Sequence, residues 1–207
     1  MSLFTLEQVN YENIIKYSNI QILEGGVTFI CGDSGTGKST LLKLLNGVLD
    51  PTEGEITYRG KSLSMYDSMV LRRDIFLVSQ AAYLFNGTIK DNFVTYYEYR
   101  ELACISDEEM KRYLAICSIE LPLDTMSYNL SGGEKQRVFI AICLSFEPKV
   151  LMLDEPTSAL DEKNAMFLME NIKSYYALDG RTLLVISHDK KIVDAFANHT
   201  IYLGGSR

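Results

Sequence analysis

The segment that decides the fold reads VTFICGDSGTGKST and runs from residue 27 to residue 40. It opens with a short run of β-branched and aromatic residues, 27–31, which is typical of a buried strand. Apolar residues at helical spacing then follow over residues 38–48. Between the two, the loop matches the pattern G-x-x-x-x-G-K-[ST]. The order of strand, glycine loop and helix predicts a phosphate-binding loop at the carboxyl end of a parallel strand.

The chemistry of this loop follows from its residue types. Glycines let the backbone curl so that successive N–H groups point inward, and the positive end of the following helix faces the same point. We expect Lys38 to reach the β- and γ-phosphates and the Ser39 hydroxyl to ligate Mg²⁺. The alternative, a glycine turn that only caps a helix, gives the lysine no role. The predicted phosphate-binding residues are Gly32, Asp33, Ser34, Gly35, Thr36, Gly37, Lys38 and Ser39.

Two carboxylates end another apolar run. Residues 150–153 (VLML) are followed by Asp154 and Glu155. A buried parallel strand that ends in these residues would place both acids at the ligand-binding edge of a sheet. We expect Asp154 to hold Mg²⁺, directly or through water, and Glu155 to orient or deprotonate an attacking water. A strand followed by a solvated acidic turn is the alternative, and the phosphate-binding loop disfavours it.

A third segment, residues 129–137 (NLSGGEKQR), has the features of a helix start. Ser131 is a favourable N-cap residue, and Gly132 and Gly133 leave the backbone open, so we expect a second anion-binding helix terminus. An ordinary N-cap with incidental glycines is the simpler alternative.

Strands and helices alternate along the rest of the chain, which predicts an α/β fold with an open parallel sheet and helices on its faces. Residues 81–129 are rich in tyrosine and lack a clear buried strand, so we expect helices and loops there. These tyrosines are expected in the core or half-buried, or in a docking groove. Further strands are expected at 54–59, 75–79 and 182–187, and further helices at 133–146, 162–176 and 190–198.

Composition narrows the class of protein. The 207 residues are 47% hydrophobic and 23% charged, which excludes a disordered chain. With 20 Lys and Arg against 27 Asp and Glu, the net charge of −7 argues against non-specific nucleic-acid binding. The four cysteines lack metal-ligand spacing, which suits reduced thiols in a cytosolic protein. We expect no secretory leader, no membrane span and no regulatory domain after the last strand.

Several motifs together resemble those of ATP-binding cassette (ABC) ATPases. Residues 130–137 (LSGGEKQR) resemble the family's signature motif, and Gln80 ends a predicted strand where the family has its Q-loop glutamine. Residues 158–161 (SALD) resemble the D-loop, and His188 follows a predicted strand at the place of the switch histidine. The similarity extends from about residue 22 to residue 203.

The resemblance implies a P-loop NTPase sheet domain of the ABC ATPase type, residues 1–80 and 130–207, with a helical subdomain inserted at 81–129. It also implies an ATP-dependent homodimer in which each ATP lies between the phosphate-binding loop of one subunit and Ser131, Gly132 and Gly133 of the other. The implied partner is an integral membrane permease encoded separately, with no nucleic acid. The chain would be cytoplasmic and peripheral on the inner face of the cell membrane.

Roles for individual residues follow from the same resemblance. Lys38 and the loop amides hold the phosphates of ATP, with Thr40 on the α-phosphate side. Ser39 and Gln80 ligate Mg²⁺, and Asp154 supports them.

The implied catalytic set is Glu155, His188, Gln80 and Lys38. Glu155 is the catalytic carboxylate, and His188 holds the γ-phosphate and the attacking water. Asp161 crosses the dimer interface and couples the two sites.

The sequence departs from the family pattern in places. The candidate for stacking on adenine is Tyr11, although simple alignment places Asn13 nearer that point. Ile142 stands where the family commonly has arginine. Residues 121–129 lack the acidic-glycine loop of fused exporters.

The leading hypothesis is a stand-alone transporter ATPase, and similarity to metal (iron) efflux ATPases is a narrower version of it. One alternative is a non-transport ABC ATPase acting on ribosomes or DNA. Another is a generic P-loop kinase or GTPase, in which the signature segment and Gln80 would have no role.

Overall fold

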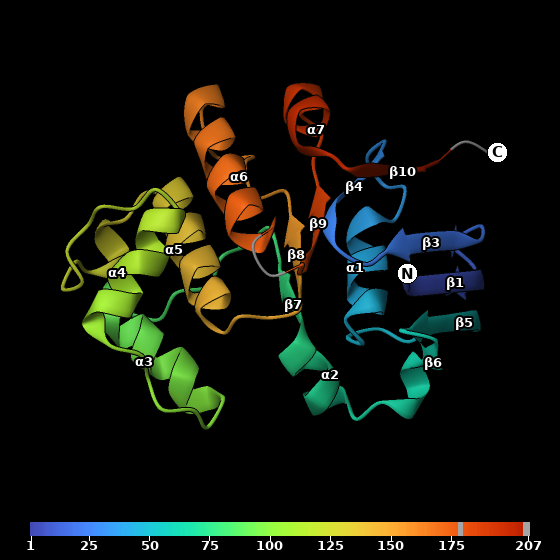
Figure 1. Ribbon diagram of the computed structural model, residues 1–207, viewed down its shortest axis with the longest axis horizontal. Helices are drawn as coiled ribbons and strands as arrows, with labels where there is room; N and C mark the ends of the chain where they lie inside the picture. The colour runs from blue at the N-terminus through green and yellow to red at the C-terminus, as the bar shows by residue number, and fades with distance from the viewer. Residues whose placement is uncertain (178–179, 205–207) are drawn as a thin grey trace.

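A five-stranded parallel sheet forms the centre of the molecule, in the strand order β10-β4-β9-β8-β7. The computed structural model describes residues 1–177 and 180–204. The predicted α/β fold with an open parallel sheet is confirmed, and Figure 1 shows helices on both of its faces. The strands are β4 (Gly26–Gly32), β7 (Ile75–Val78), β8 (Val150–Asp154), β9 (Thr182–Ile186) and β10 (His199–Leu203).

The inner strand β8 is buried on both faces, and its first four residues are all apolar. In β8, Leu151 and Leu153 pack in the core on the side of the C-terminal helices. Val150 and Met152 pack in a second core on the opposite face. This alternation explains why a parallel strand covered on both sides reads as a continuous apolar run.

A second, antiparallel sheet covers one face through helix α1 (Lys38–Leu45). Figure 1 shows α1 between the two sheets, where Leu41 and Leu45 are buried. Only β5 of this sheet was predicted from the sequence. The strand β1 was not predicted, because a bulge, with Gln8 at φ 48°, interrupts its alternation of apolar residues. The antiparallel strands are β1 (Ser2–Tyr11), β2 (Ile15–Lys16), β3 (Ile20–Leu23), β5 (Glu53–Tyr58) and β6 (Lys61–Ser62).

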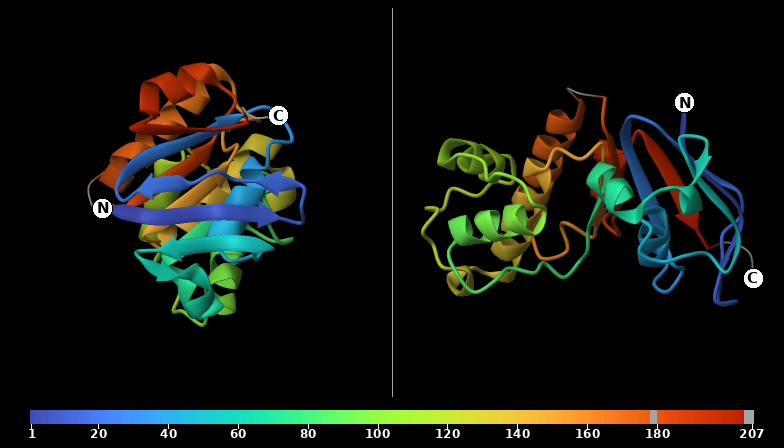
Figure 2. Two further views of the ribbon diagram at one scale, coloured as in Figure 1. Left: turned by 90° about the vertical axis from the view of Figure 1, so that its right-hand side faces the viewer. Right: turned by 90° about the horizontal axis from the view of Figure 1, so that it is seen from below.

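The remaining helices lie mainly on the other face, and Figure 2 shows α3 and α4 gathered at the end of the molecule remote from the antiparallel sheet. The short helix α2 was not predicted. Ile142 on α5 is fully buried in the core. The helices are α2 (Ser68–Asp74), α3 (Ile89–Tyr99), α4 (Asp107–Ile116), α5 (Gly132–Ser145), α6 (Glu162–Ala177) and α7 (Lys190–Phe196), with short 3₁₀ turns η1 (Leu63–Met65) and η2 (Ser127–Asn129).

Residues 81–129 hold α3, α4 and η2, and all of them are described. In this segment the only β pairing is an isolated bridge between Thr88 and Met126, as expected from its sequence. Its treatment as a separate subdomain stays a prediction, and residues 178–179 and 205–207 of the assigned core lie outside the described residues.

The tyrosines of this segment divide into two groups. Tyr97 and Tyr113 are buried and Tyr96 is half-buried, as expected. Three others are exposed, which contradicts burial for them and leaves the expectation of a docking groove untested: Tyr83, Tyr99 and Tyr128. Tyr83 and Tyr99 both contact the ring of Phe85 at the surface, with centroid distances of 5.0 and 5.7 Å.

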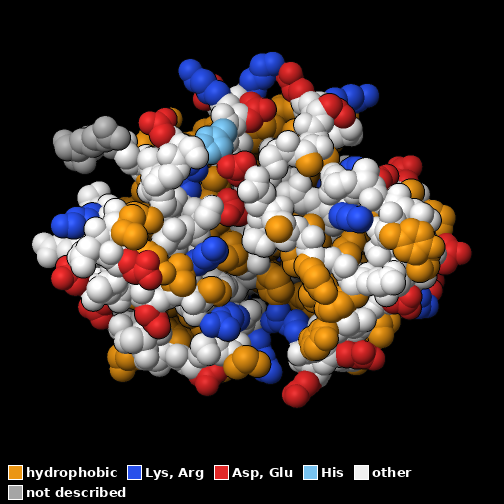
Figure 3. Space-filling view, turned by 180° about the vertical axis from the view of Figure 1, so that it is seen from behind, with side chains coloured by type: hydrophobic (Ala, Val, Ile, Leu, Met, Phe, Trp, Pro, Cys, Tyr) orange, Lys and Arg blue, Asp and Glu red, His pale blue; other side chains and the backbone are white. Residues whose placement is uncertain are grey.

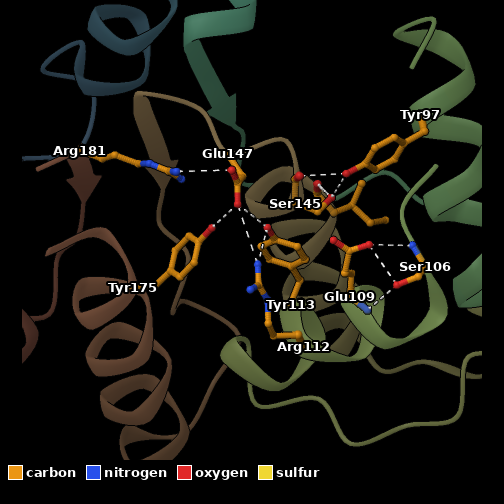
Figure 4. Close-up of polar contacts among 10 residues, drawn as sticks. Tyr97, Ser106, Glu109, Arg112, Tyr113, Ser145, Glu147, Tyr175 and Arg181 are labelled. Carbon is orange, nitrogen blue, oxygen red and sulfur yellow. Dashed lines mark hydrogen bonds and ion pairs between the residues drawn. The ribbon is translucent and has the colours of Figure 1, made fainter. Parts of the chain in front are cut away.

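One carboxylate connects several helices at the far end of α5. The Glu147 Oε1 atom accepts hydrogen bonds from the hydroxyls of Tyr113 on α4, at 2.8 Å, and Tyr175 on α6, at 3.2 Å. Arg112 and Arg181 lie 3.9 and 3.6 Å from the same carboxylate (Figure 4). The hydrogen bond from Tyr113 is the largest cause that holds the pKa of Glu147 below its ordinary value.

The surface carries both signs of charge. Figure 3 shows acidic and basic side chains interspersed over the rear face. Within residues 1–177 and 180–204, no helix has the length and apolar character needed to cross a bilayer.

Candidate functional site

The parallel sheet brings the predicted site residues to one edge. Because β4, β7, β8 and β9 run in the same direction, their carboxyl ends meet there. The glycine loop begins at Gly32, the last residue of β4, and Asp154 ends β8. Gln80 and His188 each follow the end of their strand by two residues. Segments far apart in the sequence therefore share one site.

Lys38 lies across the mouth of the glycine loop. Its Nζ atom donates to the carbonyl oxygens of Gly32 at 2.9 Å and Asp33 at 2.8 Å. The lysine is 6% exposed, so its charge is held inside the loop. Gly37 caps α1 at φ 90°, and no side chain in the described part of the chain caps this terminus. The first turn of α1 thus presents backbone donors and a positive charge to a common point.

Close packing explains why Gly37 has to be glycine. A Cβ atom there would lie 2.7 Å from a methyl group of Ile15 and 2.8 Å from the Tyr17 hydroxyl oxygen. That hydroxyl donates to the Gly37 carbonyl at 2.7 Å. The loop is therefore braced by the β1–β2 hairpin.

The same hairpin distinguishes the two candidates for adenine stacking. Tyr11 pairs with Ile15, whose side chain lies against the loop at Gly37. Asn13 sits in the hairpin turn at φ 56°, and its Oδ1 atom accepts a hydrogen bond from Asn10 at 3.0 Å. Tyr11 is therefore the cross-strand neighbour of a residue that contacts the loop, and its stacking on adenine stays a prediction.

The other loop residues differ in exposure. Asp33, Ser34, Gly35 and Ser39 are exposed, whereas Thr36 and Thr40 are half-buried. Gln80 is exposed and Asp154 half-buried. Hydroxyl, amide and carboxylate oxygens of the kind that Ser39, Gln80 and Asp154 offer are donors that suit Mg²⁺.

Glu155 and His188 form a pair. The Glu155 Oε1 atom lies 3.1 Å from His188 Nε2, and both side chains are partly exposed. They line a cleft of about 300 Å³ together with Ser158, Leu160 and Ser187. The segments that follow β8 and β9 thus place a carboxylate and an imidazole where a water molecule could reach both.

The backbone at Glu155 is unusual. Its φ of 52° lies in the left-handed region, although the next residue, Pro156, normally favours an extended conformation before it. Such a conformation costs about 1–3 kcal/mol and persists only where the surroundings enforce it. The Glu155 N–H donates to Ile186 O at 3.1 Å, and the Glu155 carbonyl accepts from Gln136 Nε2 at 3.1 Å. Sequence reasoning missed Gln136, because nothing in its spacing signals this contact.

The start of α5 is occupied by its own side chains. Ser131 is the N-cap and donates from N and Oγ to Glu134 Oε2 at 2.8 and 2.7 Å. The Glu134 N–H donates back to Ser131 Oγ at 3.3 Å. These bonds lower the pKa of Glu134, the largest cause being the bond from the serine side chain. The predicted second anion site therefore has a carboxylate beside it in the free chain.

Residues 158–161 pack against this helix start. A Cβ atom at Gly133 would lie 2.9 Å from Leu160 Cδ2 and 3.2 Å from Ala159 O. Asp161 is exposed and accepts the Asn164 N–H at 3.0 Å, a bond that lowers its pKa. The carboxylate of Asp161 thus stands at the start of α6.

Known proteins resemble this chain along most of its length. A family model described as ABC transporter matches residues 15–158. The methionine import ATP-binding protein MetN of Aliivibrio fischeri is 35% identical over 201 residues, which cover 93% of this chain and 58% of MetN. The probable iron export ATP-binding protein FetA of Escherichia coli is 34% identical over 195 residues, which cover 91% of this chain and 85% of FetA.

A solved structure of an ATP-binding cassette also resembles this chain. The dimeric ATP-binding cassette MJ0796, in a post-hydrolysis state bound to ADP and Pi, matches with a TM-score of 0.81 and 30% identity. The match covers 97% of this chain and 94% of that one. Some relatives are much longer, since the chain spans 64% of one further curated relative and 14% of another.

Proposed function

From its membership of the ABC transporter family, to which this chain belongs, we propose that it binds and hydrolyses ATP as the cassette subunit of a transporter with a separate membrane permease. The observation that carries this proposal is the shared sheet edge. The glycine loop with Lys38 and the pair of Glu155 and His188 lie at the ends of parallel strands.

ATP binding begins at the glycine loop. Lys38 exchanges its bonds to the Gly32 and Asp33 carbonyls for bonds to the β- and γ-phosphate oxygens, so little side-chain ordering is needed. The amides of the loop and of the first turn of α1 point toward the same phosphates. Thr40 lies on the α-phosphate side, and Tyr11 contacts the adenine ring.

Ser39, Gln80 and Asp154 are the residues that would hold Mg²⁺ with the phosphates. When bound, the ion neutralises charge on the β- and γ-phosphate oxygens. Ser39 supplies a hydroxyl oxygen, Gln80 an amide oxygen, and Asp154 a carboxylate directly or through water.

Glu155 carries the chemistry of hydrolysis. Its carboxylate orients the attacking water and accepts a proton from it, while His188 holds the γ-phosphate and the same water. At 3.1 Å the two side chains contact each other directly, which supports a single water molecule that contacts both of them. Glu155 and His188, with Gln80 and Lys38, make up the proposed catalytic set.

A second copy of the chain completes each site. Ser131 and Gly132 are exposed on the free chain, and the γ-phosphate bound by a partner subunit would take the place of the Glu134 carboxylate at the Ser131 donors. Asp161, also exposed, would reach across the same interface. ATP then bridges the two subunits, and hydrolysis separates them.

The permease determines the cargo and the direction of transport. The chain would act at the cytoplasmic face of the membrane, bound to the permease and without nucleic acid. Co-purification with a membrane protein rather than with nucleic acid is the result expected from affinity isolation.

A mixing experiment tests the shared site. Ser131→Arg and Lys38→Ala subunits are each expected to be inactive as homodimers, because each lacks one half of both sites. Mixed in equal amounts, they form heterodimers with one intact composite site and recover part of the ATPase activity. Two outcomes contradict the proposal: full wild-type activity in the mixture, or full activity of the Ser131→Arg variant alone.

A further inference from the structure

We propose that Gln136 is a positioning residue that holds the catalytic Glu155 in its reactive orientation. This inference rests on the proposed function, because it assigns a role to Gln136 in the hydrolysis of ATP. It adds a residue that acts through the backbone of Glu155.

The contact between the two residues is direct and buried. Gln136 lies on α5, little more than a turn after its N-cap Ser131, and is 4% exposed. Its Nε2 atom donates to the Glu155 carbonyl oxygen at 3.1 Å. A buried amide is expensive to leave unpaired, so this hydrogen bond fixes both partners.

The backbone of Glu155 needs such a restraint. Its left-handed φ of 52°, directly before Pro156, is a conformation that the chain would leave if it were free to do so. The N–H of Glu155 is held by Ile186 O on β9 at 3.1 Å, and the carbonyl is held by Gln136. With both ends fixed, the Cα–Cβ bond directs the carboxylate to His188.

Ser158 makes a similar contact but cannot replace Gln136. Its Oγ atom also donates to the Glu155 carbonyl, at 3.1 Å, and its N–H does so at 3.3 Å. Ser158 follows Glu155 by three residues and belongs to the same turn, so it moves with the turn. Gln136 comes from a separate helix and anchors the turn to the rest of the molecule.

The position of Gln136 on α5 also connects the start of this helix, which is proposed to face the partner's nucleotide, with Glu155, which is proposed to act on the subunit's own nucleotide. The first turn of α5 carries Ser131 and Gly133, and Gly133 packs against Leu160 in the segment that follows Glu155. One helix therefore contacts both ends of residues 155–160. If the nucleotide of a partner subunit displaced α5, the movement would pass through Gln136 to the carboxylate of Glu155, which acts on the nucleotide of its own subunit.

Gln136→Met is the most direct test, because methionine has nearly the same length and shape but cannot donate. We expect kcat for ATP hydrolysis to fall by about 10- to 100-fold, as a misplaced catalytic group does. The affinity for ATP, measured by equilibrium binding, should stay within about two-fold of wild type, since only a transition-state contact is lost. If the variant does not fold, Gln136→Asn, whose shorter side chain withdraws the amide, gives the same comparison.

Ser145→Ala is the matched control. Ser145 is also a buried polar side chain of α5, and it accepts a hydrogen bond from the Tyr97 hydroxyl at 3.2 Å, far from Glu155. We expect a loss of thermal stability comparable to that of the Gln136 variant, with kcat near that of wild type. A fall in kcat of equal size in both variants would assign Gln136 a merely structural role and overturn the inference.

Gln136→Glu supplies a pH readout. A carboxylate cannot donate to the Glu155 carbonyl, but a protonated carboxyl can, so the activity relative to wild type should rise as the pH is lowered. A ratio that does not change with pH, together with an unchanged kcat in Gln136→Met, refutes the inference. A wild-type chain that hydrolyses no ATP refutes instead the proposed function, so the two failures are distinguishable.

Discussion

Two helix starts in this molecule have glycine-rich sequences, yet they differ in what fills them. The start of α1, at Gly37, has no side-chain cap among the described residues and carries the ammonium group of Lys38. The start of α5 has a complete capping box, in which Ser131 and Glu134 exchange hydrogen bonds. The first terminus is ready for an anion, whereas the second already holds a carboxylate.

This difference shows that a helix N-terminus is not by itself an anion site. At α1 the backbone donors of the first turn stay available because glycine supplies the cap, and Lys38 adds a positive charge. At α5 the Glu134 carboxylate satisfies the donors of Ser131, so a phosphate would meet a negative charge. We expect α1 to bind nucleotide alone and α5 to contribute only when a nucleotide is already held by a partner subunit.

The largest effect is expected at the first terminus. Lys38→Ala removes the only side-chain cation that bonds to the loop carbonyls among the described residues, and it should weaken ATP binding by at least about 100-fold, or roughly 3 kcal/mol. Isothermal titration with ATP measures the change. Lys43→Ala, an exposed lysine in the last turn of the same helix, should bind ATP as wild type does. Tight ATP binding by Lys38→Ala would contradict the expectation that the start of α1 binds nucleotide through this lysine.

Next in size is the loss of the catalytic carboxylate. Glu155→Gln should lower kcat by about 10²–10³-fold, since the amide cannot accept a proton from water, and should leave ATP binding intact. The variant should then accumulate as a dimer on size-exclusion chromatography with ATP. Glu162→Gln, in the same cleft but paired with Lys191 at 2.8 Å, is the control and should hydrolyse ATP normally. Normal turnover by Glu155→Gln would assign the base to another residue.

A smaller effect separates the capping role of Ser131 from its proposed contact with phosphate. Ser131→Ala should lower the free energy of unfolding by about 1 kcal/mol and also reduce ATPase activity. Ser106→Ala removes an equivalent capping box, formed with Glu109 at the start of α4. It should cost similar stability in chemical denaturation and leave ATPase activity unchanged. Equal ATPase activity in the two variants would show that the start of α5 is only a cap.

The smallest effect concerns the charge at α5. The folded chain lowers the pKa of Glu134 below its ordinary value of 4.5. Its ionised form therefore adds stability that is fully present above pH 4.5 and is lost as the pH falls through the lowered folded value. Glu134→Gln should flatten the dependence of unfolding free energy on pH in that acidic range, as followed by urea denaturation. In a Ser131→Ala background the same substitution should change this dependence less.

The parts of the fold that follow from local sequence were predictable. The apolar run ending at Asp154 and the glycine loop ending at Lys38 each combine a continuous pattern with a distinct terminal residue, so their strands and helix were anticipated. β1 was not, because the bulge at Gln8 shifts its apolar residues out of phase. Gln136 was not anticipated because its role depends on a partner brought near by folding. The contact of Glu134 was missed although Ser131-x-x-Glu134 is the pattern of a capping box, which the sequence does signal.

Glu147 shows how a long-range contact can outweigh local backbone preference. It directly follows Phe146, the C-cap of α5, and has φ 50°, a position at which helices commonly end in glycine. Glycine would relax the backbone there but would remove the carboxylate at which α4, α6 and the residues before β9 meet. Glu147→Gly, a change that improves the turn itself, would therefore be expected to loosen the helical end of the molecule as a whole.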